Sequence, residues 1–239
     1  MEADPPALRH TFGQVLCYHL VGTLLRLFFR AYGRLQIIGL RENIPRTGPI
    51  LLCANHASNL DPPLGWAAFY GYRRLRGVAK IELWNNRAAA YVMNAHDSIS
   101  IRRGGVDRSM FKAVLEGMGR GDAIGIFPEG TRTYDGKLNP GLPGIGMLVQ
   151  KNGIPVAPVA VMGTYEMLPR GAKRLRRSRL RIVFGAPIHF DHATSREQIA
   201  QRIMEEIAAL MTQHGVPTEP PGLERAALLA ERRAGHDGD

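Results

Sequence analysis

The stretch that decides the fold is LLCANHASNLDPP, from Leu51 to Pro63. It opens with an apolar run typical of a buried strand and turns polar at Asn55 and His56, with Asp61 five positions after the histidine. A carboxylate bound to one imidazole nitrogen fixes the tautomer and leaves the other nitrogen to accept a proton, as in a general base. Taken alone, the spacing fits a structural histidine, or an aspartate that only caps the helix expected after the two prolines, about as well.

Segments on both sides of this stretch alternate between strand and helix patterns. Apolar runs bounded by turn residues predict strands over 34–40, 49–55, 75–80, 97–101, 123–128, 154–163 and 179–185. Apolar periodicity predicts helices over 11–33, from 62, over 82–93, 107–121 and 144–152, and from Ser195, where Gln198 completes a capping box. The alternation predicts an α/β domain with a mixed, largely parallel sheet flanked by helices, and functional groups in the loops at strand ends.

Length and composition favour one domain with an acidic partner. The 239 residues, 45% of them hydrophobic, are enough for a sizeable core. We expect an N-terminal helical segment over 1–33, the main domain over 34–214, and a tail over 215–239 with at most one short helix. The net charge of +10 indicates nucleic acid, an anionic membrane or a phosphorylated substrate, and two cysteines are too few for a disulfide framework.

The N-terminal segment is apolar enough to suggest contact with a membrane. Residues 11–25 contain no charged side chain, but this run is shorter than the roughly 20 residues that span a bilayer, and Arg26, Arg30 and Arg34 follow at helical spacing. We therefore predict a helix in the membrane interface whose arginines reach lipid phosphates. Acidic residues before the run argue against a signal peptide. A helix that only packs on the domain is the alternative.

Two further stretches place arginines beside glycines after a strand. IFPEGTR puts Glu129 and Arg132 in a turn, and ISIRRGG does the same with Arg102 and Arg103. Both are typical of places where backbone and guanidinium groups approach an anion closely. Neither is specific by itself.

In this order and spacing, the blocks resemble those of the glycerophospholipid acyltransferase superfamily, whose prototype is 1-acylglycerol-3-phosphate acyltransferase. The resemblance runs over about residues 40–187 and implies the glycerol-3-phosphate acyltransferase-like fold. NHASNLD matches the first block, which implies that His56 is the general base and Asp61 its partner. ISIRRGG resembles the second and implies that Arg103 binds the substrate phosphate.

The other two blocks add the remaining residues of the expected site. FPEGTR matches the third block residue for residue, which implies that Glu129, Gly130 and Arg132 bind the glycerol phosphate moiety. IPVAPVAV resembles the fourth, in which Pro158 lies in a strand that lines the acceptor or acyl site. The segment NPGLPGIG, over 139–146, departs from many relatives, which have Lys and Phe shortly before the glycine. The resemblance therefore leaves open both a phosphate contact from this loop and the identity of the acceptor headgroup.

The resemblance implies an acyltransferase of phospholipid biosynthesis. It would move a fatty acyl chain from acyl-CoA or acyl carrier protein to the free hydroxyl of 1-acyl-sn-glycerol 3-phosphate (lysophosphatidic acid), forming phosphatidic acid. We expect no cofactor, no metal and no acylated enzyme, and a place at the cytoplasmic face of the cell membrane. Oxyanion stabilisation is expected from backbone N–H groups near Gly130. Another lysophospholipid or a lyso-aminolipid as acceptor, or a non-catalytic protein that binds anionic lipid, are the alternatives.

Other chemistries fit the sequence less well. Cys53 lies three residues before His56, an offset that in a strand points the two side chains to opposite faces, which argues against a Cys-His pair. The chain has no G-x-S-x-G, and GTRTYDGKL lacks the spacing and the Ser or Thr of a phosphate loop. No histidine pair has metal-ligand spacing, and for His96 and Asp97 we expect a solvated turn.

The stretch over 170–181 contains seven basic residues in twelve. Nucleic-acid binding would favour interleaved aromatic residues that stack on bases, and there are none. Contact with anionic lipid headgroups fits better, so we expect no nucleic-acid partner, and a charged loop in solvent is the alternative.

Overall fold

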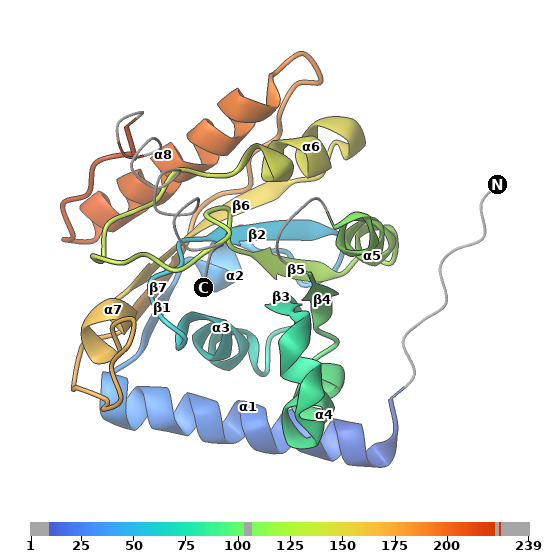
Figure 1. Cartoon of the computed structure of the whole chain (residues 1–239), viewed down its shortest axis with the longest axis vertical. Coiled ribbons are helices and arrows are strands. Elements are labelled where there is room, and N and C mark those ends of the chain that lie inside the picture. The colour runs from blue at the N-terminus through green and yellow to red at the C-terminus, as the bar shows by residue number, and fades with distance from the viewer. Residues whose placement is uncertain (1–9, 103–106, 223–224, 226–239) are drawn as a thin grey trace, which may run out of the picture.

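The computed structural model describes residues 10–102, 107–222 and 225, and within them a single seven-stranded sheet carries helices on both faces (Figure 1). In chain order the elements are α1 (Phe12–Gly33), β1 (Gln36–Ile38), α2 (Leu40–Asn43), β2 (Ile50–Ala54), α3 (Asp61–Phe69), β3 (Leu75–Lys80), the 3-10 helix η1 (Ile81–Asn85), α4 (Arg87–Ala95), β4 (Ile99–Ile101), α5 (Arg108–Gly119), β5 (Ala123–Ile126), α6 (Pro143–Asn152), β6 (Val156–Met162), α7 (Thr164–Met167), β7 (Arg181–Phe184) and α8 (Arg196–Gln213).

The sheet has the strand order β1-β7-β6-β2-β5-β3-β4. All neighbouring strands are parallel except β6 and β7, which pair antiparallel with Val159 opposite Phe184. This confirms the predicted mixed, largely parallel α/β sheet. Because β2, β5 and β6 are parallel neighbours, their carboxyl ends lie together at one edge of the sheet, and the loops that follow them meet there.

Side chains from the sheet supply two separate halves of the core. In β2, Leu51 and Cys53 belong to the half covered by α5, α6 and α8, whereas Ile50 and Leu52 belong to the half covered by α3, which Phe29 of α1 joins. The alternation follows from the period of two in a strand. Burial raises the pKa of the Cys53 thiol, and this thiol is fully enclosed in the core, so it cannot serve as the nucleophile.

Several boundaries differ from the sequence predictions. The first strand spans three residues instead of the expected seven, because Gly39 adopts a positive φ of 75° and the chain turns into α2. The helix expected over 82–93 is divided at Asn86, whose extended backbone interrupts it while its side chain accepts a hydrogen bond from the Ala89 N–H and caps α4. An N-capping asparagine competes with helix continuation in this way. The capping box at Ser195 and Gln198 is confirmed.

Helix α1 lies against α3 and α4 (Figure 1). Its inner side includes the buried Phe29 and Gly22, which is packed against the ring of Tyr70. Arg26 also turns inward and donates a hydrogen bond to the Tyr70 carbonyl, so the prediction that this arginine reaches lipid phosphates is wrong. The Arg26 guanidinium instead binds the backbone carbonyl of Tyr70, at the end of α3.

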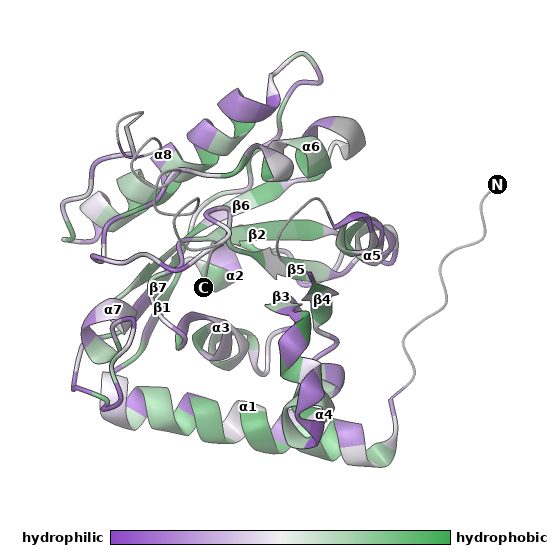
Figure 2. Ribbon diagram, viewed as in Figure 1, coloured by the Kyte–Doolittle hydropathy of each residue, from purple (hydrophilic) through white to green (hydrophobic). Residues whose placement is uncertain are grey.

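The outer side of α1 exposes Phe12, Leu16, Leu20, Leu24 and Leu27. Figure 2 shows α1 as a largely hydrophobic helix at the outside of the molecule. Within the described part of the chain, α1 is the one helix whose length and composition would allow it to cross a membrane. The inner side of α1, by contrast, packs against the rest of the domain.

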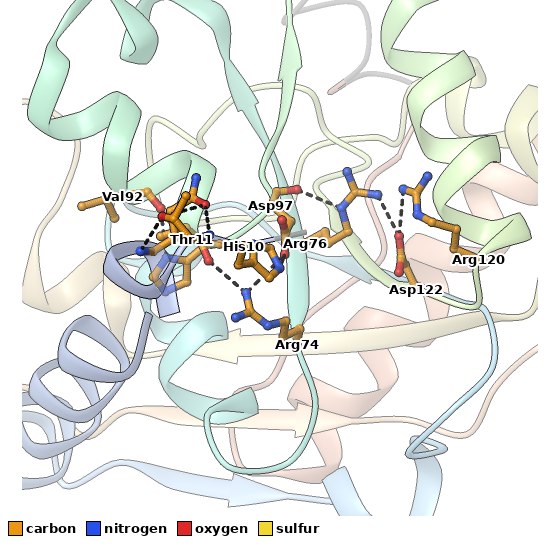
Figure 3. Close-up of polar contacts among 11 residues, drawn as sticks. His10, Thr11, Arg74, Arg76, Val92, Asp97, Arg120 and Asp122 are labelled. Atoms are coloured by element: carbon orange, nitrogen blue, oxygen red, sulfur yellow. Dashed lines mark hydrogen bonds and ion pairs between the residues drawn. The ribbon is translucent and has the colours of Figure 1, made fainter. Parts of the chain in front are cut away.

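A network of ion pairs joins the amino ends of three strands (Figure 3). Asp97 accepts from Arg74 at 3.2 Å and lies 3.4 Å from the His10 ring, and Asp122 pairs with Arg76 at 2.8 Å. Arg76 also donates to the backbone carbonyl of Asp97 at 2.9 Å, which connects Asp97 to Asp122. The network ties the starts of β3, β4 and β5 together, at the sheet edge opposite the loops that follow β2 and β5.

The solvated turn expected at His96 and Asp97 is wrong. His96 is 2% exposed and stacks on Trp66 with 4.2 Å between ring centres. Burial lowers the pKa of its imidazole, and the ring nitrogen Nδ1 bonds to the Val92 carbonyl. His96 is therefore a neutral core residue, and Asp97 is held by the arginine network.

The close approach of α1 to Tyr70 gives a test of its docking. A Cβ atom at position 22 would come within 2.3 Å of the aromatic ring, so Gly22→Val should lower the free energy of unfolding by about 1–3 kcal/mol. Leu20→Ala, on the exposed side of the same helix, should change it by less than about 0.5 kcal/mol. Urea unfolding measures both, and equal effects would show that α1 is not packed on the domain through this face.

Candidate active site

His56 follows β2 directly, and its ring is held from below by a buried aspartate. Nδ1 of His56 lies 2.8 Å from Oδ2 of Asp61, whose side chain is completely enclosed. The same oxygen accepts the N–H groups of Ala57 and Ser58, each at 2.7 Å. Because this oxygen already accepts two N–H groups, it acts as an acceptor toward the ring as well, which places the proton of the neutral ring on Nδ1. Nε2 makes no hydrogen bond to the described residues, and the ring is partly exposed.

The loop that holds His56 is fixed at both ends by short polar contacts. Asn55 closes two hydrogen bonds with the backbone of Val161 in β6, at 2.9 and 2.7 Å. Ser58 donates to the Leu168 carbonyl at 2.7 Å. Asp61 is the first residue of α3, so the turn between His56 and Asp61 ends in a helix that fixes the direction of the carboxylate. Sequence reasoning identified the His-Asp pair and missed the part played by Asn55.

Glu129 is buried between two loops rather than pointing into solvent. It is 1% exposed; Oε1 accepts the His56 N–H at 2.6 Å, and Oε2 accepts the Asn139 N–H at 3.0 Å. Burial raises the pKa of Glu129 to about 8, and the two N–H donors offset part of that effect. Glu129 thus joins the His56 loop to the site loop, which we define as residues 129–139. Its contact with glycerol phosphate stays a prediction.

Phe127 completes the surroundings of the histidine, and it was not among the site residues predicted from the sequence. Its ring stacks on the His56 ring with 3.9 Å between centres and 12° between planes. The Thr133 N–H donates to the His56 carbonyl at 2.9 Å, so the site loop binds both polar groups of the His56 backbone. Gly130 adopts a positive φ of 66° and its own N–H bonds to the Phe127 carbonyl, which removes this N–H as an oxyanion donor.

Of the two predicted site arginines, the structure describes Arg132. Arg132 belongs to the site loop, and its carbonyl accepts from Arg170 at 3.4 Å. Arg170 itself comes from the basic stretch after α7 and lies over the Tyr134 ring at 3.9 Å. Arg103 lies outside the described residues, just after Arg102, whose N–H donates to Asp107 at the start of α5. The structure therefore brings His56, Asp61 and Glu129 into contact and leaves the cation contacts as predictions.

An apolar pocket lies between α3 and the sheet and begins beside the His-Asp pair. It contains about 540 Å³ of space not filled by atoms, its open mouth included. Its walls come from α3, five neighbouring strands and the residue that stacks on the histidine: Leu52, Ala54, Asp61, Pro62, Gly65, Trp66, Phe69, Leu75, Gly77, Val78, Gly125, Ile126, Phe127, Val159, Val161, Ile182 and Phe184.

Pro158 is not part of this wall. It lies in β6 as predicted, but on the face shared with Val156 and Ala160, where it packs beside Gly185 under α8. The strand alternation turns Pro158 itself away from the pocket, although its strand contributes to the walls. Its neighbours Val159 and Val161 take that place.

Comparison of the chain with known proteins assigns a family to the segment that contains this site. Residues 37–162, which include His56, Asp61 and Glu129, match the Acyltransferase family. The chain belongs to this family. Within the described residues there is no group of three His, Cys, Asp or Glu side chains placed to hold a metal ion.

Individual relatives support the same assignment at low identity. The chain is 26% identical over 230 residues to a probable 1-acyl-sn-glycerol-3-phosphate acyltransferase of Mycoplasma pneumoniae, covering 89% of this chain and 82% of the relative. It is 28% identical over 154 residues to a 1-acyl-sn-glycerol-3-phosphate acyltransferase of Brassica napus, covering 62% of this chain and less than half, 43%, of that relative.

The fold is similar to that of a solved 1-acyl-sn-glycerophosphate acyltransferase from Thermotoga maritima. The TM-score is 0.71 at 24% identity, and the match covers 84% of this chain and 79% of the other. This likeness confirms the predicted fold class.

The buried carboxyl of Glu129 predicts a pH effect on stability. Its pKa is about 8 in the folded chain and about 4.3 in an unfolded one, so between these values the folded state binds a proton that the unfolded state does not. The free energy of unfolding should therefore fall by a few kcal/mol from pH 5 to pH 8 and level off above. Glu129→Gln should remove this part of the slope, as measured by urea unfolding across that range, while losing one acceptor for a backbone N–H. Parallel slopes in the two proteins would contradict the assignment.

Proposed function

We propose that the chain transfers a fatty acyl group from a thioester donor, acyl-CoA or acyl carrier protein, to the free hydroxyl of 1-acyl-sn-glycerol 3-phosphate. The observation that supports this most is the fixed His56 ring: Nδ1 is bound to a buried carboxylate, Nε2 has no hydrogen bond to the described residues, and Asp61 and Phe127, which contact the ring, line an apolar pocket. The names of the relatives in Mycoplasma pneumoniae and Brassica napus point to the same acceptor.

The chemistry follows from the two nitrogens of the ring. Nε2 of His56 removes the proton of the acceptor hydroxyl as its oxygen attacks the thioester carbonyl carbon. The C–S bond then breaks, and the imidazolium returns the proton to the leaving thiolate, so that ester and free thiol are formed with no acyl-enzyme. Asp61 holds the ring and stabilises its transient positive charge, and Asp61 is supported in turn by two backbone N–H groups.

The apolar pocket suits the acyl chain of one substrate. Its walls are almost entirely hydrocarbon, and they include Asp61 and Phe127, which both touch the His56 ring. A chain seated there would place its carbonyl end beside the base and exclude water from the reaction. Gly65, Gly77 and Gly125 lie along the walls, where larger side chains would shorten the available length.

The acceptor headgroup would lie over the site loop. Arg132 belongs to this loop, Arg170 contacts its carbonyl and lies over the Tyr134 ring, and Arg103 is proposed to add a third cation. Guanidinium groups bind phosphate with paired hydrogen bonds. A different lysophospholipid or a lyso-aminolipid would keep the same chemistry, and the headgroup contacts decide between them.

The outer side of α1 and the basic stretch form one surface for an anionic membrane, at the cytoplasmic face of the cell membrane. The basic stretch packs on the end of α1 through hydrogen bonds from the Leu180 N–H to the Gly33 carbonyl at 2.8 Å and from the Tyr32 hydroxyl to the Leu175 carbonyl at 3.2 Å. Leu175 is exposed like the leucines of α1, and cations surround it. Apolar insertion and headgroup attraction would then act on the same face.

Removal of the base tests the proposed reaction. His56→Ala should abolish transfer of labelled oleoyl groups to lysophosphatidic acid, and Asp61→Asn should reduce it by about 10²-fold or more because the ring loses its fixed orientation. Purified protein is assayed with acyl-CoA and with acyl carrier protein, against lysophosphatidic acid and a panel of other lyso-acceptors.

The panel separates the alternatives. Product with another acceptor alone would keep the chemistry and change the substrate. Full activity of His56→Ala would contradict the role of the base. Vesicle binding with no transfer from any donor would favour a non-catalytic anionic-lipid-binding protein.

Charge reduction in the basic stretch tests the membrane surface. The double variant Arg174→Gln, Arg176→Gln should bind vesicles of anionic lipid roughly 30-fold more weakly, since each cation contributes about 1 kcal/mol at such a surface. The matched control Arg196→Gln, Arg202→Gln removes two exposed cations from α8, which covers the opposite face of the sheet from α1. Sedimentation with vesicles measures binding, and equal losses in both pairs would show only a general charge effect.

A further inference from the structure

The C-terminal tail places one arginine against the loop that supports the catalytic histidine. Arg225 lies beyond α8, in the stretch that the sequence predicted to be a tail. Its guanidinium forms a paired contact with Asp135, at 2.7 Å to Oδ1 and 3.0 Å to Oδ2. It also donates to the Asn139 side-chain oxygen at 3.1 Å and to the Lys137 carbonyl at 3.3 Å. One side chain thus binds three residues of the site loop.

These contacts continue to the base through buried groups. Asn139 is completely enclosed, and its N–H donates to Oε2 of Glu129, whose Oε1 accepts the His56 N–H. Two residues, Asn139 and Glu129, therefore link Arg225 to the backbone of His56 by hydrogen bonds. Because Glu129 and Asn139 are both enclosed, a shift of the loop at Asn139 would move the carboxylate that holds His56.

The site loop is also held at other points, where Leu138 is buried in the core and the Tyr134 carbonyl accepts from the Tyr165 hydroxyl at 3.0 Å. It contains no helix or strand, and its internal bonds are short turns in which Thr133, Asp135 and Lys137 bond to one another. Arg225 donates hydrogen bonds to Asp135, and mainly for that reason the pKa of this carboxyl lies well below its usual range. Arg170 contacts the loop further along, at Arg132 and Tyr134. The Arg225 fork is thus the described contact that joins Asp135 to Asn139.

We propose that Arg225 is a positioning residue for His56, acting through Asp135, Asn139 and Glu129. The planar guanidinium suits this task, because it can bind a carboxylate with two parallel bonds and still donate to a second acceptor, which an ammonium group does less well. The kinetic part of this inference rests on the proposed acyl transfer. Its structural part does not.

The experiment combines two readouts on four proteins: wild type, Arg225→Ala, Arg225→Lys and the control Arg202→Ala. Arg202 is an exposed arginine on α8 whose one ion pair is to Glu206 on the same helix. Hydrogen exchange of peptides covering residues 55–61 and 129–139 should become faster in Arg225→Ala, with an intermediate rate in Arg225→Lys and no change in Arg202→Ala. A thermal melt shows that the variants remain folded.

Steady-state kinetics distinguish positioning from general support. Arg225→Ala should lower kcat by roughly 10- to 100-fold with a smaller change in KM, since misplacement of a base affects the reaction more than binding. Arg225→Lys should recover part of the loss. Asp135→Asn combined with Arg225→Ala should cost little more than either change alone, because both remove the same contact.

Each result decides one of the two proposals. Unchanged exchange and unchanged kcat in Arg225→Ala would overturn the positioning role, as would additive losses in the double variant. If wild type shows no transfer from any donor to any acceptor, the proposed function fails, and the exchange rates still decide whether Arg225 holds the loop of His56.

Discussion

The buried carboxyl group of Glu129 is the contact on which the site depends. It holds the His56 backbone on one side and the Asn139 backbone on the other, so two loops that follow different strands become one unit. Asp61 holds the ring of His56 through a hydrogen bond with Nδ1. A buried carboxylate without hydrogen-bond donors is costly, which is why both acids lie against backbone N–H groups that the turns present to them. The histidine is thereby fixed at its main chain and at one ring nitrogen, while the other nitrogen stays open.

The sheet separates this site from the contacts that stabilise its far edge. His56 and Phe127 follow the carboxyl ends of β2 and β5, whereas Asp97 and Asp122 with their arginines join the amino ends of β3, β4 and β5 (Figure 3). In a parallel sheet, this arrangement leaves the carboxyl-end loops free to vary with function while the opposite edge is held by ion pairs. The pocket lies between the sheet and α3, and its walls include Asp61 and Phe127, which contact the His56 ring.

Much of this could be predicted from the sequence because it is local. The apolar run before Asn55 predicts the strand, and the prolines after Asp61 predict the helix. A turn of five residues between them is enough to bring the Asp61 side chain back to the His56 ring. What the sequence could not show depends on distant partners. Arg225 and Asp135 are 90 residues apart, and nothing in the polar, proline-containing tail predicts their contact. The same limitation applies to His96, whose ring packs against the distant Trp66 and Tyr18, and to Arg26, which turns toward the Tyr70 carbonyl at the end of α3.

The proposed reaction requires that Asp61 hold the His56 ring with Nδ1 protonated and Nε2 open to accept the hydroxyl proton. Nitrogen-15 NMR of histidine-labelled protein measures this tautomer directly, with the His56 resonances assigned by their loss in His56→Gln. At alkaline pH we expect a protonated Nδ1 and an unprotonated Nε2 for wild type, and a loss of this preference in Asp61→Asn. A proton on Nε2 of neutral His56 in the wild-type protein would contradict it, because the ring could not then act as the base.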